Sequence, residues 1–596
     1  MRWEPGLAVC FGAIFFAGDL PCLKAVCPGS HQSSTSDEPD YLEVTGQTGE
    51  RGGTLILSER SEAKTFNPLI AIDGTSRETI ALMMADLIHI NRYTQQSEPA
   101  LAKSWAISQD GRRYTLHLRR GLRFSDGHPF DADDVVFTFR AYLDQRIHAP
   151  QRDFLIVGGR PISVQKLDAY TVLFNLAEPY AAAERLFDSI AILPRHLLEA
   201  AYEDGTLGSA WGLNVAPDQI AGLGPFRLKQ YVPGQKIVLE RNPFFWKRDG
   251  KRNVLPYLHE IVCLSDISSE AETIRFEAGE TDIVSRIGAE NFAILNKDEG
   301  RRRFRMYDAG PGLEYTFLAF NLNDLVQGRE PSITEKQKWF RQTAFRQAIS
   351  NTIDRGAIVR LAYAGRAYPL LVPVSPGNRL WFDPAIPRPL RSVERAKRLL
   401  REAGFSWSAD GSLNDVRGRR VEFSIMHNAR RAQHVQMATI IQQDLKDIGI
   451  KVNLIPLDFA TLVDRVFNSF VYEAAIVTLA DGDSDPNSQM SILLSHGAAH
   501  AWKLRSNSSP DEWQQEIDRL MEAQMTTIDH SIRKQMFDRV QQLVWQHEPV
   551  IFLVSPDILA GASDRVGNFQ PAVLSSYTLW NADQLFIRGE QSVAPR

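Results

Sequence analysis

Helix-type and strand-type hydrophobic patterns alternate in the later half of the chain, and this alternation limits the fold more than any other feature. One helical stripe ends at Gly449 and a strand pattern follows at 450–454; the stripe consists of Val435, Ala438, Ile441, Leu445 and Ile448. A second stripe ends at Pro549, before the strand-like run VIFLV; it consists of Ile532, Met536, Val540, Leu543 and Val544. Such helix-then-strand units predict the α/β class. Because 596 residues are too many for one ordinary core, we expect more than one lobe.

The segment 101–139 carries clear turn, strand and helix signals. Asp110-Gly111 and Asp126-Gly127 are turn dipeptides, and the alternation between them over 114–118 predicts a half-buried strand. Asp131 precedes the helical run ADDVVFTFRAYL, whose first amides its side chain can cap. The run TVLFNL farther along predicts another strand. No short repeat occurs, which excludes solenoids and propellers.

The N-terminal segment has the composition of an export signal. Arg2 supplies a positive charge, and 7–18 form an apolar run that is too short to span a bilayer. We therefore interpret 1–29 as a signal or lipoprotein signal. The following residues, 30–51, are rich in Ser, Asp, Glu, Gly and Thr, and we expect them to form a flexible tether.

Three of the four cysteines, Cys10, Cys22 and Cys27, lie in or next to this signal. Cys27 precedes the polar tether, as in a lipid-anchored protein, whereas Lys24 stands where such signals carry an aliphatic residue. Export with a lipid on Cys22 or Cys27 and export without one both stay open. Cys263 has no partner for a disulfide inside the folded body, and we expect it to be a small buried side chain.

Charge and histidine spacing exclude several functional classes. The net charge is −5 and no basic stripe occurs, so we expect no nucleic-acid partner. No cysteine and histidine cluster has zinc spacing, and the motif H-E-x-x-H is absent. We therefore expect neither a bound metal nor a cofactor.

Five ordered stretches carry a family resemblance. The strongest, PALAKSWAISQDGRRYTLHLRRGLRFSDGHPFDADDVVFTF, spans 99–139 and contains the family's tryptophan, Asp-Gly turn, Phe-x-Asp-Gly-x-Pro-Phe and Ala-x-Asp-Val-Val-Phe elements in order. The others begin with GLGPF at 222–247, FLAFNLND at 317–324 (continued by FRQAISNTIDRGAIV at 345–359), MATIIQQ at 437–458 and ADGDSDPNS at 480–488. The chain thereby resembles the family 5 extracellular solute-binding proteins, the dipeptide, oligopeptide and nickel receptors of bacterial ABC importers.

This resemblance implies a fold and its division into domains. The fold would be α/β, a bilobed periplasmic-binding-protein clamshell of type II, cluster C, with an additional third domain. An extra domain would span 86–222 and lobe II 313–554. Lobe I would be discontinuous and would consist of 52–85, 223–312 and 555–596. The chain would cross between the lobes near Phe320 and near Val554-Ser555.

The resemblance also implies a function. The protein would be a monomeric periplasmic or cell-envelope receptor, not an enzyme, that captures a small peptide or related solute and delivers it to an ABC permease in the membrane. Nickel chelates, heme, opines and oligosaccharides stay open as ligands. A secreted hydrolase is an alternative from another class, although a G-x-S-x-G elbow is absent. A membrane-tethered chaperone or sensor that never meets a permease is a third.

Three aspartates, Asp481, Asp483 and Asp485, crowd one loop. An EF-hand would need Gly and Glu where Pro486 and Ile492 stand, which excludes that calcium site. In peptide receptors of the resembled family, an aspartate of this loop binds the ligand's α-ammonium group, a charge-assisted pair. Counting from the preceding helix selects Asp481, and counting back from the Asp-Pro pair leaves Asp483 as the alternative. Solvated turn formers are the third interpretation.

Two further ligand contacts follow from the resemblance. Arg430 and Arg431 lie in the loop where dipeptide receptors carry an arginine for the peptide carboxylate, although Asn428 stands at the aligned position. A guanidinium suits that role because it offers two parallel donors. Phe66 and Asn67 resemble a loop that touches ligand from lobe I. For both pairs, an exposed surface loop is the alternative interpretation.

Overall fold

The structure is a computed structural model that describes residues 38–265, 268–299, 303–323, 331–480, 482–503 and 509–589. The chain from Pro39 onward forms one compact unit. No helix within the described ranges has the length and apolarity of a membrane span. The expected signal and its cysteines Cys10, Cys22 and Cys27 lie outside these ranges.

Twelve strands of the described chain form one sheet, in the order β11-β12-β14-β2-β15-β24-β17-β23-β21-β22, with β16 and β18 also paired to β24. The part that we call the first lobe contributes β2 (Thr54–Glu59), β11 (Phe226–Val232), β12 (Lys236–Arg241), β14 (Glu260–Ser265), β15 (Ile283–Val284) and β16 (Phe304–Pro311). The second lobe contributes β17 (Glu314–Phe320), β18 (Ala367–Pro369), β21 (Glu422–Asn428), β22 (Lys451–Leu457) and β23 (Ala474–Ala480).

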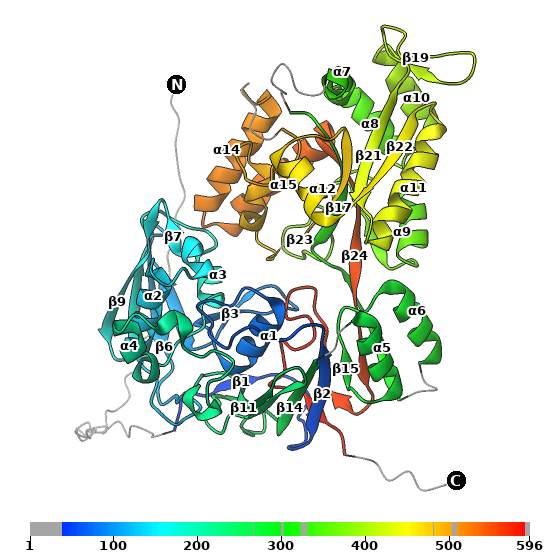
Figure 1. Ribbon diagram of the computed structural model, residues 1–596. Coiled ribbons are helices and arrows are strands. Elements are labelled where there is room, and N and C mark those ends of the chain that lie inside the picture. The colour runs from blue at the N-terminus through cyan, green and yellow to red at the C-terminus, as the bar shows by residue number, and fades with distance from the viewer. Residues whose placement is uncertain are drawn as a thin grey trace, which may run out of the picture. The chain divides into compact units, whose positions relative to one another are not determined.

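Strand β24 (Val550–Ser563) belongs to both lobes and runs from one to the other (Figure 1). Its first residues pair with β17, and residues 557–563 pair antiparallel with β16. Between these two sections, the Ser555 hydroxyl donates to the Gly312 carbonyl at 2.8 Å, and the Gly312 amide donates to the Pro556 carbonyl at 2.9 Å. The two crossings between the lobes therefore lie side by side.

The first crossing lies at Gly312, so its expected position near Phe320 is wrong. Phe320 is fully buried at the far end of β17, where its ring centroid lies 4.9 Å from that of Phe340 and 5.6 Å from that of Phe423. The second crossing lies where it was expected. The run VIFLV continues through Pro556, because no ladder hydrogen bond needs an amide at that position.

The second lobe surrounds its sheet with helices around one core. The two expected helices are confirmed as α11 (Ala432–Lys446) and α15 (His530–His547). Most of their apolar residues are buried, whereas Val435 and Ile532 face outward. The other helices of this lobe are α7 (Pro331–Phe340), α8 (Thr343–Thr352), α9 (Arg355–Ala362), α10 (Val393–Glu402), α12 (Phe459–Val463), α13 (Met490–Leu493) and α14 (Glu512–Thr526).

The extra domain contains a separate four-stranded sheet. Its order is β5 (Ala102–Ile107), β6 (Arg113–Leu118), β10 (Thr171–Asn175) and β9 (Ser163–Asp168). Helix α2 (Ala132–Leu143) begins as expected: the Asp131 carboxylate accepts from the Asp133 amide at 2.8 Å, and a capping box completes the turn. The domain also contains β3 (Ile88–Ile90), β4 (Ser97–Pro99), β7 (Ile156–Val157), β8 (Arg160–Pro161), α3 (Ala183–Asp188) and α4 (Arg195–Glu203).

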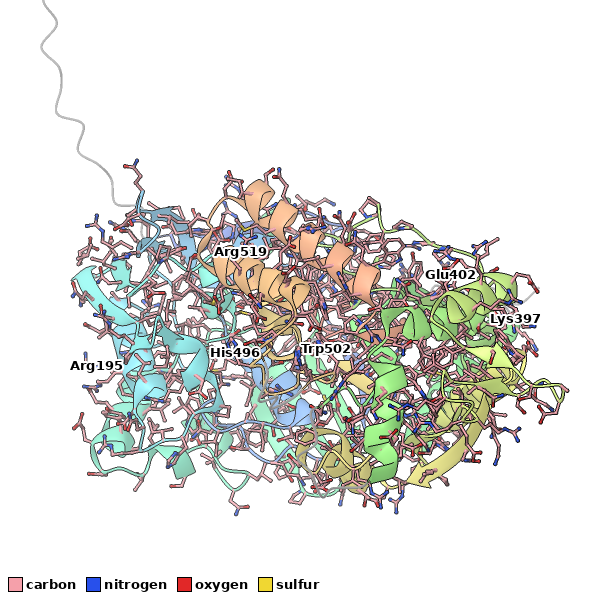
Figure 2. The ribbon with its side chains drawn as sticks, turned by 90° about the horizontal axis from the view of Figure 1, so that it is seen from above. Arg195, Lys397, Glu402, His496, Trp502 and Arg519 are labelled. Carbon is pink, nitrogen blue, oxygen red and sulfur yellow. The ribbon has the colours of Figure 1, made fainter. Side chains whose placement is uncertain are left out.

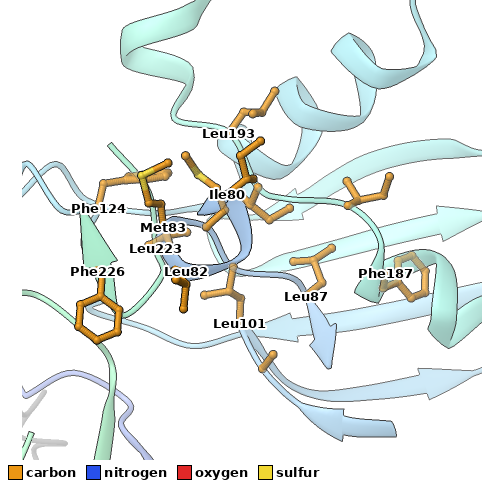
Figure 3. Close-up of a cluster of buried hydrophobic side chains, with 14 of the residues drawn as sticks. Ile80, Leu82, Met83, Leu87, Leu101, Phe124, Phe187, Leu193, Leu223 and Phe226 are labelled. Atoms are coloured by element: carbon orange, nitrogen blue, oxygen red, sulfur yellow. The ribbon is translucent and has the colours of Figure 1, made fainter. Parts of the chain in front are cut away.

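The extra domain and the first lobe share one hydrophobic core. Helix α1 (Gly74–Met83) lies at its centre, with Leu101 and Phe226 from the two sides (Figure 3). Gly224 must be glycine, since a Cβ there would lie 2.4 Å from the Met83 carbonyl carbon. Because the two cores merge, the limits of 86–222 and of the two lobes stay a prediction.

The expected tether is partly structured. Strand β1 (Leu42–Val44) pairs in parallel with β13 (Lys247–Asp249), and Leu42 and Val44 pack against the shared core. Residues 39–51 therefore do not form a free tether, which corrects the expectation for this part of 30–51. Two apolar residues at alternate positions were enough to dock the segment.

The remaining elements are short or peripheral. In the view from above, Arg195 of α4 lies at one end and Lys397 and Glu402 of α10 lie at the other (Figure 2). Cys263 is buried as expected, and burial raises the pKa of its thiol. The other elements are α5 (Ser269–Ala278), α6 (Ala289–Asp298), β19 (Ser406–Trp407), β20 (Leu413–Asn414), β25 (Val566–Gly567) and β26 (Phe586–Ile587).

Candidate functional site

A cavity of about 1600 Å³ lies among the first lobe, the extra domain and the second lobe. Its lining includes residues 556–559 of β24, Arg185 and Asp188 of α3, and Asp483 and Asp485 of the loop that follows β23. Strand β23 lies next to β17, which follows the Gly312 crossing. The sheet therefore delivers the aspartate loop to the space between the lobes.

Asp485 has its hydrogen bonds within the second lobe. Its carboxylate accepts hydrogen bonds from both Nη atoms of Arg533, at 2.6 and 2.7 Å, and both side chains are 5% exposed. The Arg533 Nε donates to the carbonyl and the side chain of Gln524 at 3.0 and 2.8 Å. The same carboxylate accepts from the Asn487 amide at 3.0 Å and begins a 3-10 turn. A weaker contact reaches outside the lobe: Nε of Arg185, on the extra domain, lies 3.7 Å from Oδ2 of Asp485.

Asp483, two residues earlier, faces the cavity. Its Oδ1 accepts from Nη1 of Arg185, on the extra domain, and from the Ser484 amide at 2.6 Å. Its side chain is 35% exposed, and no described residue donates to Oδ2. Burial raises the pKa of Asp483 above its ordinary value, and Arg185 opposes this rise only in part. The carboxylate is therefore held in place with one oxygen free.

The two arginine candidates of the second lobe, Arg430 and Arg431, have other surroundings than Asp483. Asp481 lies outside the described residues. Arg430 is exposed and does not line the cavity, whereas its neighbour Arg431 does and binds Glu314 at 2.7 Å. An arginine from this loop thus reaches the cavity wall, but already paired with a carboxylate.

Phe66 and Asn67 belong to the shared core. Phe66 is fully buried, and its ring packs edge-on against Tyr231 at 5.8 Å. Asn67 donates to the carbonyls of Leu207 and Ala210 at 2.8 and 3.0 Å. Neither lines the cavity. The sequence resemblance marked a loop whose polar residue ties the first lobe to the extra domain.

Asp86, His89 and Asp188 bring three potential metal-ligand atoms within 4.8 Å of one another on the cavity wall. His89 Nδ1 lies 3.0 Å from Asp86 and 3.5 Å from Asp188. However, Arg92 donates to both oxygens of Asp188, at 2.9 and 3.1 Å, and the Ile90 amide donates to the same carboxylate at 2.8 Å. A metal cation would compete with this guanidinium, so the group fits a hydrogen-bonded wall better than a metal centre.

Two arginines of the cavity wall, Arg77 and Arg286, are exposed and have no carboxylate within ion-pair distance among the described residues. The Arg286 guanidinium lies 5.1 Å from the centre of the Tyr577 ring. By contrast, Arg366 of the same wall binds Asp308 at 2.8 Å. Arg77 and Arg286 are therefore available to an anionic group of a ligand.

The chain matches the family described as bacterial extracellular solute-binding proteins, family 5, over residues 96–501, more than half of its length. The protein belongs to this family. The expected resemblance is thus confirmed, and with it a place outside the cytoplasm.

Two relatives of this family 5 protein match along nearly the whole chain. The probable ABC transporter-binding protein of Deinococcus radiodurans is 27% identical, with 93% of each chain covered. The oligopeptide-binding protein AppA of Bacillus subtilis is 24% identical, with 90% of this chain and 92% of AppA covered.

A solved structure confirms the fold. The ABC transporter substrate-binding protein CtaP of Listeria monocytogenes superimposes with a TM-score of 0.72 at 23% identity, and the match covers 90% of this chain and all of CtaP. The expected bilobed clamshell with a third domain is therefore the fold of this family 5 protein.

Sequence reasoning missed the residues of the extra domain that complete the cavity wall. Arg185 lies 298 positions before Asp483, and no local pattern singles it out. Arg92 and Asp188 are likewise 96 positions apart. The Arg185–Asp483 pair could be found only by placing α3 beside the second lobe. The Arg92–Asp188 pair could be found only by placing α3 beside the hairpin that follows β3.

Proposed function

We propose that this protein is the receptor of an ABC importer, and that it captures peptides in the cavity between its lobes. The observation that carries the proposal is the Asp483 carboxylate, which lines a cavity of about 1600 Å³ and whose Oδ2 has no donor among the described residues. A ligand ammonium group at Oδ2 would form a charge-assisted hydrogen bond with this carboxylate. The name of the Bacillus subtilis relative, an oligopeptide-binding protein, supports the same ligand class.

The other end of a peptide has a partner in the same cavity. Arg77 and Arg286 are exposed cations of the first lobe, and a guanidinium binds a carboxylate with two parallel hydrogen bonds. A peptide that lies between them and Asp483 contacts both lobes. Ligand binding then favours the closed arrangement, because only that arrangement offers both contacts.

The size of the cavity favours a peptide of several residues over a dipeptide. Cavities for drug-sized ligands measure roughly 300–1,000 Å³, and this cavity is larger.

We infer that the closed receptor docks on a membrane permease as a monomer. A lipid on Cys22 or Cys27, if present, would hold it at the membrane surface.

Native mass spectrometry of the protein, purified without denaturant and then mixed with a random pentapeptide pool, tests the ligand class. We expect stoichiometric complexes with free-amino peptides. Binding of a sugar, heme or metal chelate in preference to the pool would contradict the peptide assignment. Turnover of the pool to shorter products would instead favour the hydrolase.

A further inference from the structure

The extra domain meets the second lobe at a second contact besides the Arg185–Asp483 ion pair. Gln95, at the tip of the β3–β4 hairpin, donates from Nε2 to the Gly377 carbonyl at 2.6 Å. Its Oε1 accepts from the Arg379 amide at 3.0 Å. Gln95 is fully buried, although its backbone has a φ of 66°. A glutamine held in this left-handed conformation, with both ends of its amide used, is built into the contact.

This contact continues to the crossing between the lobes. The Ser375 hydroxyl donates to the Gly312 carbonyl at 2.6 Å. A Cβ on Gly377 would lie 1.8 Å from the Pro311 carbonyl oxygen, so residue 377 must be glycine for the loop to rest on the crossing. We call residues 375–379 the junction loop. It connects the crossing with the extra domain.

The junction loop also holds the aspartate loop. Asn378 is buried and donates to the Ser484 carbonyl at 2.7 Å. From the other side, Arg185 donates to the Ser484 hydroxyl at 3.1 Å and to the Gln95 carbonyl at 3.3 Å. Ser484 is therefore fixed by Asn378 from the second lobe and by Arg185 from the extra domain.

From these contacts we propose that Arg185 is a positioning residue that sets the direction of the Asp483 carboxylate. This role rests on the proposed function. It makes Arg185, a residue of the extra domain, responsible for the selectivity of the receptor for ligands with a free amino group. Arg185 occupies Oδ1 together with the Ser484 amide and leaves Oδ2 for the ligand. Gln95 and the junction loop keep Arg185 in register with Asp483.

Two substitutions test this role without removing the ligand anchor. Arg185→Lys keeps the positive charge, but its donors sit on one nitrogen and cannot reproduce the fork in which Nη1 binds Asp483 while Nη2 binds Ser484 and the Gln95 carbonyl. Gln95→Ala removes the bonds to Gly377 and Arg379 and leaves Arg185 unchanged. Arg539→Gln is the matched control, because Arg539 pairs with Glu516 at 2.8 Å away from the cavity.

The first readout is the ratio of affinities for a random free-amino pentapeptide pool and for the same pool N-acetylated. At metal sites, loss of a residue that orients a ligating side chain costs about 10–100-fold. By the same reasoning we expect Arg185→Lys to lower the ratio about tenfold and Gln95→Ala to lower it less. The control should leave it unchanged. An unchanged or increased ratio in Arg185→Lys would overturn the proposal.

The second readout needs no ligand. Hydrogen exchange of residues 482–489 should become faster in Arg185→Lys and Gln95→Ala and stay constant in Arg539→Gln. Equal exchange in all proteins would overturn the positioning role. A wild-type protein that binds both pools equally would contradict the proposed ammonium contact instead, so the two failures can be told apart.

Discussion

Asp483 and Asp485 belong to the same loop but have opposite surroundings. Asp485 binds Arg533 with both oxygens, and both side chains are 5% exposed. Asp483 binds Arg185 with one oxygen and is 35% exposed to the cavity. Arg533 belongs to the same lobe as Asp485, whereas Arg185 belongs to the extra domain and also lies 3.7 Å from Asp485. The loop thus carries one carboxylate that serves the fold and one that we propose binds a ligand.

The difference shows how a fixed scaffold presents an available charge. The Asp485–Arg533 pair ties the start of the 3-10 turn to α15, so the backbone two residues earlier has a defined place. Asp483 can then expose an oxygen without the loop moving toward solvent. The buried Asp485–Arg533 pair thus fixes the loop, so that the Asp483 carboxylate next to it can be directed at a ligand.

Breaking the buried pair should produce the largest effect. Arg533→Met leaves the Asp485 carboxylate buried without its partner, and removal of one member of such a pair costs about 3–5 kcal/mol. We expect this loss in the free energy of unfolding measured with urea and tryptophan fluorescence. A loss under about 1 kcal/mol would show that Asp485 does not serve the fold in the way its contacts indicate.

Removing the charge of Asp483 should affect binding instead of stability. A hydrogen bond to a charged group contributes roughly 1.5–3 kcal/mol, so Asp483→Asn should weaken free-amino peptides by about tenfold or more. The melting temperature should change much less than in Arg533→Met. Titration calorimetry gives the affinity, and scanning calorimetry gives the stability. Equal peptide affinity in the variant would remove the distinction between the two aspartates.

Acid pH should weaken peptide binding through the same carboxylate. Burial raises the pKa of Asp483 above its ordinary value of 3.8, and the ionised form is the one that attracts an ammonium group. Affinity should therefore fall as the pH decreases toward that raised pKa, at a higher pH than for an exposed aspartate. Peptide titrations at several pH values check this, with Asp483→Asn as the pH-insensitive control. A parallel fall in the variant would assign the effect to other groups.

The smallest effect should come from an exposed pair of the same lobe. Arg539 and Glu516 join α14 and α15 at 2.8 Å, with side chains 41% and 33% exposed. Such pairs contribute about 0–1 kcal/mol, so Arg539→Gln should change the free energy of unfolding by less than this and leave peptide affinity unchanged. A loss as large as that of Arg533→Met would mean that burial does not separate the two pairs.

Local signals predicted the elements that local forces determine. The Asp131 cap and the helix after it were predicted because a side chain and its next three amides decide that geometry. Strand β24 was predicted too short, because a proline such as Pro556 usually ends a strand. The strand continues past it because no neighbouring strand requires a hydrogen bond from that amide, which the sequence does not reveal. Strand β1 was missed, because its partner β13 lies about two hundred positions later.

The site followed the same division. Family resemblance brought Asp483 into consideration, but the role of Asp485 became evident only through Arg533, 48 positions away. Arg185 and Gln95 carry no motif, and their partners lie 298 and 282 positions distant. Arg77 and Arg286 became candidates only because the fold places both on the cavity wall without a carboxylate of the described residues within ion-pair distance.

A crystal structure of the protein with a bound free-amino pentapeptide tests the central claim most directly. We expect the peptide's amino nitrogen to lie within hydrogen-bond distance of Oδ2 of Asp483, while Arg185 remains on Oδ1. An amino terminus bound elsewhere in the cavity, or an Arg185 displaced from Asp483 by the peptide, would contradict it.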